Sequence, residues 1–304
     1  SRLAFDRKGL DGKPVEADFS GQTWLVTGAS GGIGREIALQ AAYRGAQVVA
    51  AARSADKLTK VVEAGVEAGV EPETVECLVV DLASMSEIRT AVDELVAKGR
   101  SIDVLVNNVG VLLNAFSTTD EGFETSFATN LLNHYLLTEL LVERGLLEPG
   151  GQILNMSSGG MYSTGLVPDQ LNVTDPRRHD GVMAYARHKR AQVELTHHWN
   201  ERHGPELVFQ VMHPGWVDTE GVKTSLPGFR RLFRRILRTP VQGADTAIWL
   251  AASRPDPPAE GIWLDRELQP EHVGRHTRSE PALRQQMVDR LEGWIRQGQS
   301  NDAT

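Results

Sequence analysis

The sequence predicts an α/β fold in which a parallel sheet carries helices on both faces. Short apolar runs of β-type residues alternate with helical patterns along the 304 residues, and a glycine-rich turn follows the first run. With right-handed crossovers, this alternation specifies a doubly wound sheet. The polar motifs described below are expected at the carboxyl ends of the strands, where ligands bind to such sheets.

We expect seven strands in a single domain, because a chain of this length that is 40% hydrophobic can bury one such core. Residues 1–20 are interpreted as an N-terminal lead-in, residues 21–265 as the main domain, and residues 266–304 as an extension with a terminal helix at 281–297. The strands are predicted at residues 24–26, 48–51, 75–80, 104–106, 152–155, 207–212 and 261–264.

The glycine-rich turn runs from Thr27 to Gly34 and leads into a segment with helical apolar spacing. Gly28 permits a tight turn, Gly32 allows the backbone to approach a pyrophosphate, and Gly34 allows the helix to pack on the strand. The helix N-terminus offers N–H groups to phosphate. The order strand, turn, helix therefore predicts a Rossmann-type dinucleotide site over a merely structural turn.

A tyrosine and a lysine past the middle of the chain form a candidate proton-transfer pair. Tyr185 and Lys189 are four residues apart, which puts both side chains on one face of a helix. The ammonium would stabilise the phenolate and lower the pKa of Tyr185, making it the proton donor in a carbonyl reduction. The alternative is an accidental pair on a solvated helix face. This spacing is common by chance, so its position among the other motifs decides.

With both motifs, the chain resembles the short-chain dehydrogenase/reductase superfamily over about residues 21–265. That family has the phosphate turn T-G-x-x-x-G-x-G and the catalytic pair Y-x-x-x-K. Segments such as 157–161 and 242–246 are similar to the branch that contains the twelfth human member of the dehydrogenase/reductase series. Resemblance to this branch implies no particular substrate for the chain. Four further family signatures occur in the expected order, at Asp81-Leu82, Asn107-Asn108-Val109-Gly110, Ile153-Leu154-Asn155-Met156-Ser157-Ser158 and His213-Pro214-Gly215-Trp216-Val217-Asp218-Thr219.

The resemblance implies a catalytic set of Asn130, Ser158, Tyr185 and Lys189. In the family the second serine of such a pair is catalytic, so the role goes to Ser158, with Ser157 as the alternative. Its hydroxyl would hydrogen-bond the substrate carbonyl. Asn130 matches the asparagine that bends its helix and holds a water linking Lys189 to solvent. The alternative for Asn130 is a plain helix-face residue.

The end of the second strand bears on the choice of cofactor. NAD enzymes place a carboxylate there for the ribose 2′-hydroxyl. This chain has Ala52 followed by Arg53, whose guanidinium suits a 2′-phosphate, and Arg35 adds a second positive charge. We therefore expect NADP(H). The expected cofactor-binding residues are Gly28, Ser30, Gly31, Gly32, Ile33, Gly34, Arg53, Ser54, Asp81, Leu82, Asn108, Gly110, Tyr185, Lys189, Pro214, Gly215, Val217 and Thr219.

Two segments near the active-site motifs bear on the substrate. Residues 161–182 read as an inserted loop that would wall the substrate pocket, and the insert resembles that of retinol-dehydrogenase-like relatives, which favours a bulky, apolar carbonyl. Residues 219–239 lie where the family has a substrate lid. Within them, residues 229–238 have one apolar helical stripe and arginines elsewhere. The interpretations are a plain lid, a lid that touches an anionic membrane, or recognition of an acidic substrate group.

Composition limits the remaining possibilities. The net charge of -8 argues against a general nucleic-acid binder. The single cysteine, Cys77, is expected in the core, and the histidines show no metal spacing, so no metal is implied. No apolar run reaches the length of a transmembrane helix, so we expect a cytoplasmic protein and a homo-oligomer, with peripheral membrane contact through residues 229–238 as the open alternative.

Three functions are compatible with these motifs. An NADP(H)-dependent oxidoreductase acting on a small-molecule carbonyl or alcohol is favoured, because all four catalytic residues are present. A catalytically silent NADP-binding module is the second. A sugar-nucleotide epimerase of the extended branch is the third, and Gly32-Ile33-Gly34 counts against it, since that branch more often has G-x-x-G-x-x-G.

Overall fold

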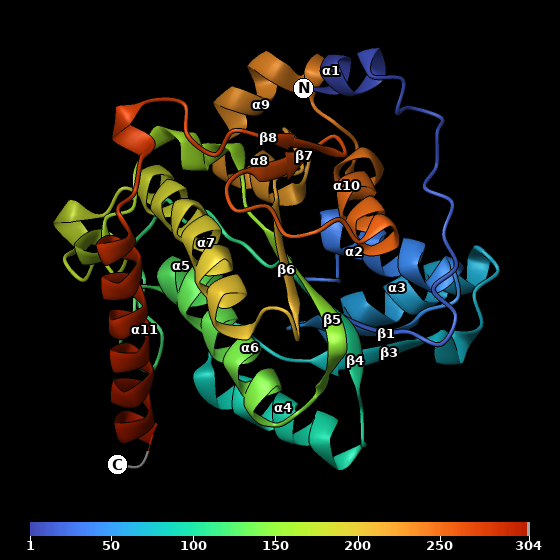
Figure 1. Cartoon of the computed structure of the whole chain (residues 1–304), viewed down its shortest axis with the longest axis horizontal. Helices are drawn as coiled ribbons and strands as arrows, with labels where there is room; N and C mark the ends of the chain where they lie inside the picture. The colour runs from blue at the N-terminus through green and yellow to red at the C-terminus, as the bar shows by residue number, and fades with distance from the viewer. Residues whose placement is uncertain (303–304) are drawn as a thin grey trace.

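The chain folds around one eight-stranded sheet with strand order β3-β2-β1-β4-β5-β6-β7-β8. The computed structural model describes residues 1–302 (Figure 1). The first seven strands run parallel, and the eighth is antiparallel to its neighbour. The strands are β1 (Thr23–Thr27), β2 (Gln47–Ala52), β3 (Val75–Val79), β4 (Ile102–Asn107), β5 (Leu147–Met156), β6 (Val208–Met212), β7 (Ile262–Leu264) and β8 (Glu267–Gln269).

Helices cover both faces of the sheet, which confirms the doubly wound fold (Figure 1). One layer contains α2 (Gly32–Tyr43), α3 (Ala55–Glu67) and α10 (Pro240–Ser253). The opposite layer contains α4 (Met85–Ala97), the short α5 (Thr125–Phe127) with the π-helical turn η2 (Ala128–Leu132), α6 (Asn133–Glu143), α7 (Gly181–His203) and α11 (Pro281–Asp302). The remaining helices are α1 (Arg2–Arg7), α8 (Glu220–Ser225), α9 (Pro227–Phe233) and the 3-10 turns η1 (Pro72–Thr74), η3 (Gly159–Ser163), η4 (Pro168–Gln170), η5 (Pro176–Arg178), η6 (Arg234–Ile236) and η7 (Arg275–Thr277).

The eighth strand is the one departure from the predicted strand count. It forms a hairpin with β7 through Asp265 and Arg266, whose φ angles are both positive, at 55° and 59°. Tight hairpins of this kind favour Asn, Asp or Gly at the first position and Gly at the second. Asp265 fits the first position, but Arg266 stands where Gly is expected, so the hairpin signal in the sequence was incomplete.

The single cysteine is also placed differently from the prediction. Cys77 lies on β3, the edge strand of the sheet, and is exposed. An apolar run predicts a strand, but it does not predict which strand lies at the edge, where one side chain in two can face water. The expectation of a core cysteine was wrong.

The two ends of the chain are packed on the main domain. Phe5 of α1 is buried, and its ring lies 5.2 Å from the guanidinium carbon of Arg238. At the other end, Trp294 of α11 contacts the Phe127 ring at 4.9 Å between centroids, and Met287 joins the same core. No helix in residues 1–302 is both long and apolar enough to cross a membrane.

Candidate active site

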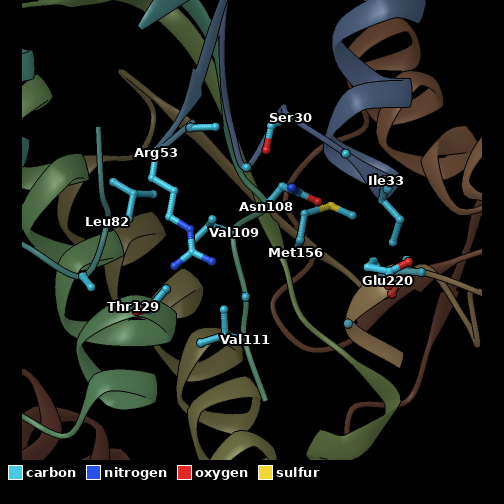
Figure 2. Close-up of a pocket in the computed structure, with 18 of the residues that line it drawn as sticks. Ser30, Ile33, Arg53, Leu82, Asn108, Val109, Val111, Thr129, Met156 and Glu220 are labelled. Carbon is cyan, nitrogen blue, oxygen red and sulfur yellow. The ribbon is translucent and has the colours of Figure 1, made fainter. Parts of the chain in front are cut away.

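A cavity of about 530 Å³ opens at the carboxyl ends of the central strands (Figure 2). It extends from Arg53, just after β2, past the ends of β1 and β4, to Tyr185 of α7 beside β5. Four adjacent strands span three spacings of about 4.8 Å, roughly 14 Å in all. The cavity is thus long enough for an extended dinucleotide.

The glycine turn forms the cavity wall at the N-terminus of α2. Gly28 and Gly32 have positive φ angles of 67° and 57°. A Cβ on Gly28 would lie 2.9 Å from the Asn108 amide, so the turn tolerates no side chain there. Gly31 caps α2 without a side-chain hydrogen bond, which leaves N–H groups of the first turn directed at the cavity. This cradle fits a pyrophosphate.

The neighbouring strand ends are held together by side-chain bonds to the turn. The Asn108 amide donates to the carbonyl of Thr27 at 2.8 Å, and the Thr27 hydroxyl accepts from the backbone N–H of Asn108 at 2.9 Å. Gly34 packs where a Cβ would lie 2.5 Å from the Gly28 carbonyl oxygen. Asn108 and Gly34 therefore shape the cradle, and of the two only Asn108 also lines the cavity.

Two cations stand at the other end of the cavity. Figure 2 shows the guanidinium group of Arg53 directed into the cavity near Leu82. Lys57, in the first turn of α3, also lines this end. Ser54 is the N-cap of α3, accepting from the N–H of Lys57 at 3.4 Å, and does not reach the wall. Arg35 also stays outside, paired with Glu36 at 2.9 Å.

The phenol of Tyr185, a half-buried side chain, lies at the end of the cavity opposite Arg53. Burial raises the pKa of Tyr185, and a hydrogen bond with the Ser158 hydroxyl opposes that rise. The adjacent Ser157 hydroxyl is used elsewhere, donating to the carbonyl of Lys189 at 2.7 Å. Of the two serines, Ser158 is the one whose hydroxyl meets the phenol.

The ammonium of Lys189 lies beneath the tyrosine ring and is not bonded to its oxygen. Its Nζ atom is 5.5 Å from the ring centroid and donates to the carbonyl of Met156 at 2.7 Å and to Gln192 Oε1 at 3.1 Å. Burial lowers the pKa of Lys189 to about 7. The expected lowering of the Tyr185 pKa by this ammonium does not appear: burial raises that pKa, and the group that opposes the rise is Ser158.

Asn130 lies in the π-helical turn η2 and is fully buried. Its side chain bonds both ways to Val111, accepting from the N–H at 2.7 Å and donating to the carbonyl at 2.8 Å. Such insertions into a helix are frequent at functional sites. The Asn130 carbonyl accepts from the Gln192 amide at 2.7 Å. The Gln192 side-chain amide therefore joins the Asn130 carbonyl to Lys189.

Similarity to known proteins identifies the family of this chain. The sequence profile described as short chain dehydrogenase matches residues 22–228. The protein belongs to this family.

The matches cover most of this chain and most of the length of each relative. Dehydrogenase/reductase SDR family member 12 of Bos taurus is 34% identical over 289 residues, covering 91% of this chain and 87% of that protein. Human retinol dehydrogenase 13 is 31% identical over 265 residues, with 83% and 78% covered. The solved structure of the angucycline C-6 ketoreductase LanV with bound NADP has a TM-score of 0.62 and 25% identity, covering 79% of this chain and 91% of that one. The chain is thus an oxidoreductase of the short-chain dehydrogenase family that uses a nicotinamide cofactor.

Most residues that sequence reasoning assigned to this dehydrogenase site line the cavity. Of the assigned residues, Gly34, Ser54, Asn130, Ser158, Gly215 and Val217 do not line it. Gly215 instead packs against Arg238, where a Cβ would lie 2.7 Å from the guanidinium, and Val217 is buried. The wall residues that were missed include Lys57, Thr125, Thr129 and Glu220. Of these four residues, only Lys57 could have been found from the sequence, as a second cation four positions after Arg53.

The insert at 161–182 supports the wall without forming it. None of its residues lines the cavity. Leu113, which does, accepts a hydrogen bond from His179 Nε2 at 3.0 Å in the tautomer that protonates this nitrogen. Leu166 and Leu171 are buried in the core instead. Its apolar residues Leu166 and Leu171 thus pack inward under α7, and its role as a wall of the substrate pocket stays a prediction.

The lid segment is shorter and more firmly held than the sequence pattern predicted. α9 ends at Phe233 and a 3-10 turn follows, so residues 229–238 do not form one helix. Leu232 is 75% exposed, whereas Phe229 and Phe233 pack on Trp216 at 5.3 Å each. Arg238 is buried and pairs with Asp265 at 2.6 Å. The prediction of one apolar helical stripe, with every arginine on the solvated side, was therefore wrong.

The described residues offer no candidate metal site. Within residues 1–302, no group of three or more histidine, cysteine or acidic side chains is placed to hold a metal ion.

Proposed function

We propose that the protein is an NADP(H)-dependent oxidoreductase that interconverts a bulky, apolar carbonyl compound and its alcohol, with Tyr185 as general acid and base. The observation that carries this proposal is the placement of Tyr185, whose phenol is hydrogen-bonded with the Ser158 hydroxyl, at one end of a dinucleotide-sized cavity with Arg53 at the other.

The reduction needs a hydride at the carbonyl carbon and a proton at its oxygen. When bound, NADPH supplies the hydride. The Ser158 hydroxyl would donate to the carbonyl oxygen and hold it beside the phenol, and Tyr185 would transfer its proton to the developing alkoxide. A phenol held neutral by burial retains that proton at pH 7, and general acids positioned in this way contribute typically a hundredfold or more to rate. Lys189 then supplies positive charge beneath the phenolate.

Preference for NADP(H) is supported by the charges at the end of β2. Arg53 and Lys57 both line the cavity there, and Ala52 stands where a carboxylate would select NAD. Two cations would contact a 2′-phosphate through charge-assisted bonds. The bound NADP in the LanV structure is consistent with this preference.

The substrate class rests on the relatives and on the lining of the cavity. Retinol and an angucycline, named in two of the relatives above, are both large and largely apolar. Val111 and Leu113 line the cavity near Tyr185, and the aromatic cluster of Trp216, Phe229 and Phe233 lies on the lid segment. These side chains suit a bulky carbonyl better than a sugar.

The test is an NADPH oxidation assay against aldehydes, ketones and quinones of graded size, with NADH in parallel. We expect turnover to increase with apolar size and to favour NADPH. A protein that binds NADPH but reduces none of these compounds would instead be the silent binding module.

A further inference from the structure

The side chain of Gln192 occupies a position that the proposed mechanism does not use. It lies one turn after Lys189 on α7 and is buried between that lysine and α6. Its amide makes three contacts, with Lys189 Nζ at 3.1 Å, with the Asn130 carbonyl at 2.7 Å and with His134 Nδ1 at 2.9 Å. All three partners are themselves buried.

The orientation of this amide is fixed by its neighbours. Oε1 faces the Lys189 ammonium, which only donates, and Nε2 faces the Asn130 carbonyl, which only accepts. A flipped amide would place two donors together and two acceptors together. The amide nitrogen therefore donates both of its protons, one to Asn130 and one to His134.

This orientation determines the state of His134. Because Nδ1 accepts from Gln192, the ring proton lies on Nε2. Burial lowers the pKa of His134 to about 3, so the ring stays neutral. The hydrogen-bonded chain thus runs from Lys189 through the Gln192 amide to Asn130 and His134.

We propose that Gln192 is the positioning residue for Lys189, holding its ammonium in place and in the charged form through the amide oxygen. This inference rests on the proposed function only in that Lys189 serves the reduction. The Met156 carbonyl is the second acceptor, so loss of Gln192 would remove one of two hydrogen bonds to a buried charge. A buried ammonium without such partners releases its proton more easily.

Other titratable groups near Lys189 do not titrate in the same range. His188 on α7 and His134 on α6 both have pKa values lowered by burial, to about 4 and about 3. Tyr185 has its pKa raised by burial. Near neutral pH the charge that changes among these facing groups is that of Lys189.

The experiment measures Lys189 directly, without turnover. Protein labelled with [ε-¹³C]lysine is titrated by NMR, and the Lys189 signal is assigned among the seven lysines from its loss in Lys189→Met. We expect Gln192→Leu to lower the pKa of Lys189 by about one unit or more. Gln192→Glu, which keeps the size and adds a charge, should raise it. Thermal unfolding checks that each variant folds.

Gln210→Leu is the matched control, because Gln210 is also a buried amide but bonds to Pro255 and Trp263, away from Lys189. It should leave the Lys189 titration unchanged. If both Gln192 variants also leave it unchanged, the positioning role is overturned, and Gln192→Glu keeps the test valid should Gln192→Leu not fold. If the titration shifts but the pH profile of kcat/KM does not follow, then Gln192 positions Lys189 and the proposed part of Lys189 in the reduction is wrong.

Discussion

Single residues set the acid-base properties of this site. Tyr185 has its pKa raised by partial burial, and its hydroxyl is the only group that Tyr185→Phe removes. We expect that variant to bind NADPH normally and to lose most of its turnover, measured by NADPH fluorescence titration and by NADPH oxidation. Tyr162→Phe, which loses a bond to the Pro270 carbonyl outside the cavity, is the control. Near-normal turnover of Tyr185→Phe would remove the phenol from the mechanism.

Arg53 is the residue on which cofactor preference is expected to depend. Arg53→Ala should weaken NADPH binding by about ten- to a hundredfold and leave NADH binding nearly unchanged, because only NADPH carries the 2′-phosphate. Dissociation constants for both cofactors measure this. Arg35→Ala serves as the comparison, since Arg35 is paired with Glu36 and lies outside the cavity wall. Equal losses for NADPH and NADH in Arg53→Ala would assign Arg53 to folding.

The lowered pKa of Lys189 also predicts how stability depends on pH. The pKa is about 7 in the folded protein against 10.5 in the unfolded chain, so between these values the unfolded state binds more protons. The contribution of Lys189 to the free energy of unfolding therefore rises with pH from about 7 to 10.5 and is constant below that window. Denaturant unfolding at pH 7 and pH 9 should show the wild type gaining stability relative to Lys189→Met. A constant difference would mean that the lysine is not shifted.

At the scale of residues, the sequence was informative where backbone geometry or chemistry restricts the choice. Only glycine fits the turn at Gly28, and only a phenol with a nearby amine suits the proposed proton transfer. Gln192 and Lys57 were missed because amides and lysines are common, and their roles depend on which elements pack beside them. The choice of Ser158 over Ser157 came from the family resemblance and stays a prediction. In the structure the Ser157 hydroxyl lines the cavity but donates to the Lys189 carbonyl, and the Ser158 hydroxyl is the one that meets the phenol.

At the scale of elements, the lid segment makes the sharpest distinction between neighbouring side chains. Phe233 packs on Trp216 and Phe229, while Leu232 beside it faces water. Phe233→Ser should raise KM for an apolar substrate several-fold with little change in kcat, whereas Leu232→Ser should leave both nearly unaltered. Steady-state kinetics on one substrate compares them. An equal effect of the two variants would show that the aromatic cluster does not form part of the substrate site.

The lid segment is also where contact with an anionic membrane surface can be tested. Arg231, Arg234 and Arg235 are exposed beside Leu232, and Arg230 is paired with Asp218 at 2.7 Å. If the lid contacts an anionic surface, the wild type should sediment with anionic liposomes at low salt and be released by added salt. A variant with glutamine at the three exposed arginines should stay in the supernatant. Wild-type protein that also stays there would end this idea and leave the lid proposal intact.

Elements were predictable where their pattern was regular. The seven parallel strands and the helix of the glycine turn follow from apolar periodicity. The helical pattern at residues 229–238 was read as one helix, because periodicity does not show where a chain turns. In the structure α9 ends at Phe233, and Arg238 farther along pairs with Asp265 near β7. β8 was missed for a similar reason, since its three residues gain their structure from the hairpin alone.

At the scale of the whole molecule, the pair Arg238 and Asp265 joins segments far apart in sequence. Arg238 donates to both Asp265 oxygens, to the carbonyl of Pro214 and to the carbonyl of Ser1. Arg238→Met should cost about 3 to 5 kcal/mol of unfolding free energy, because Asp265 would remain buried without its partner. Denaturant unfolding measures the loss. Arg230→Gln, which breaks a more exposed pair with Asp218, should cost little, and a similar loss in both would contradict this role.

Domain boundaries were less predictable than the fold. The main domain follows from its motifs, but the segments before and after it were interpreted as a lead-in and an extension. In the structure Phe5 and Met287 are both buried in contact with that domain. Their sequences lack the motifs of the main domain, and only the packed structure shows what they cover. The homo-oligomer stays a prediction.

The position of α11 has a consequence for biosynthesis. Met287, Val288 and Leu291 complete a core whose other residues lie as far back as β1, so that core cannot close before residues 281–295 leave the ribosome. A nascent chain ending short of them would already contain the glycine turn and the Tyr185 pair, yet would display Phe127 and its neighbours to chaperones. A premature stop codon before Pro281 should therefore yield protein that is degraded or aggregated, even though every active-site motif has been translated.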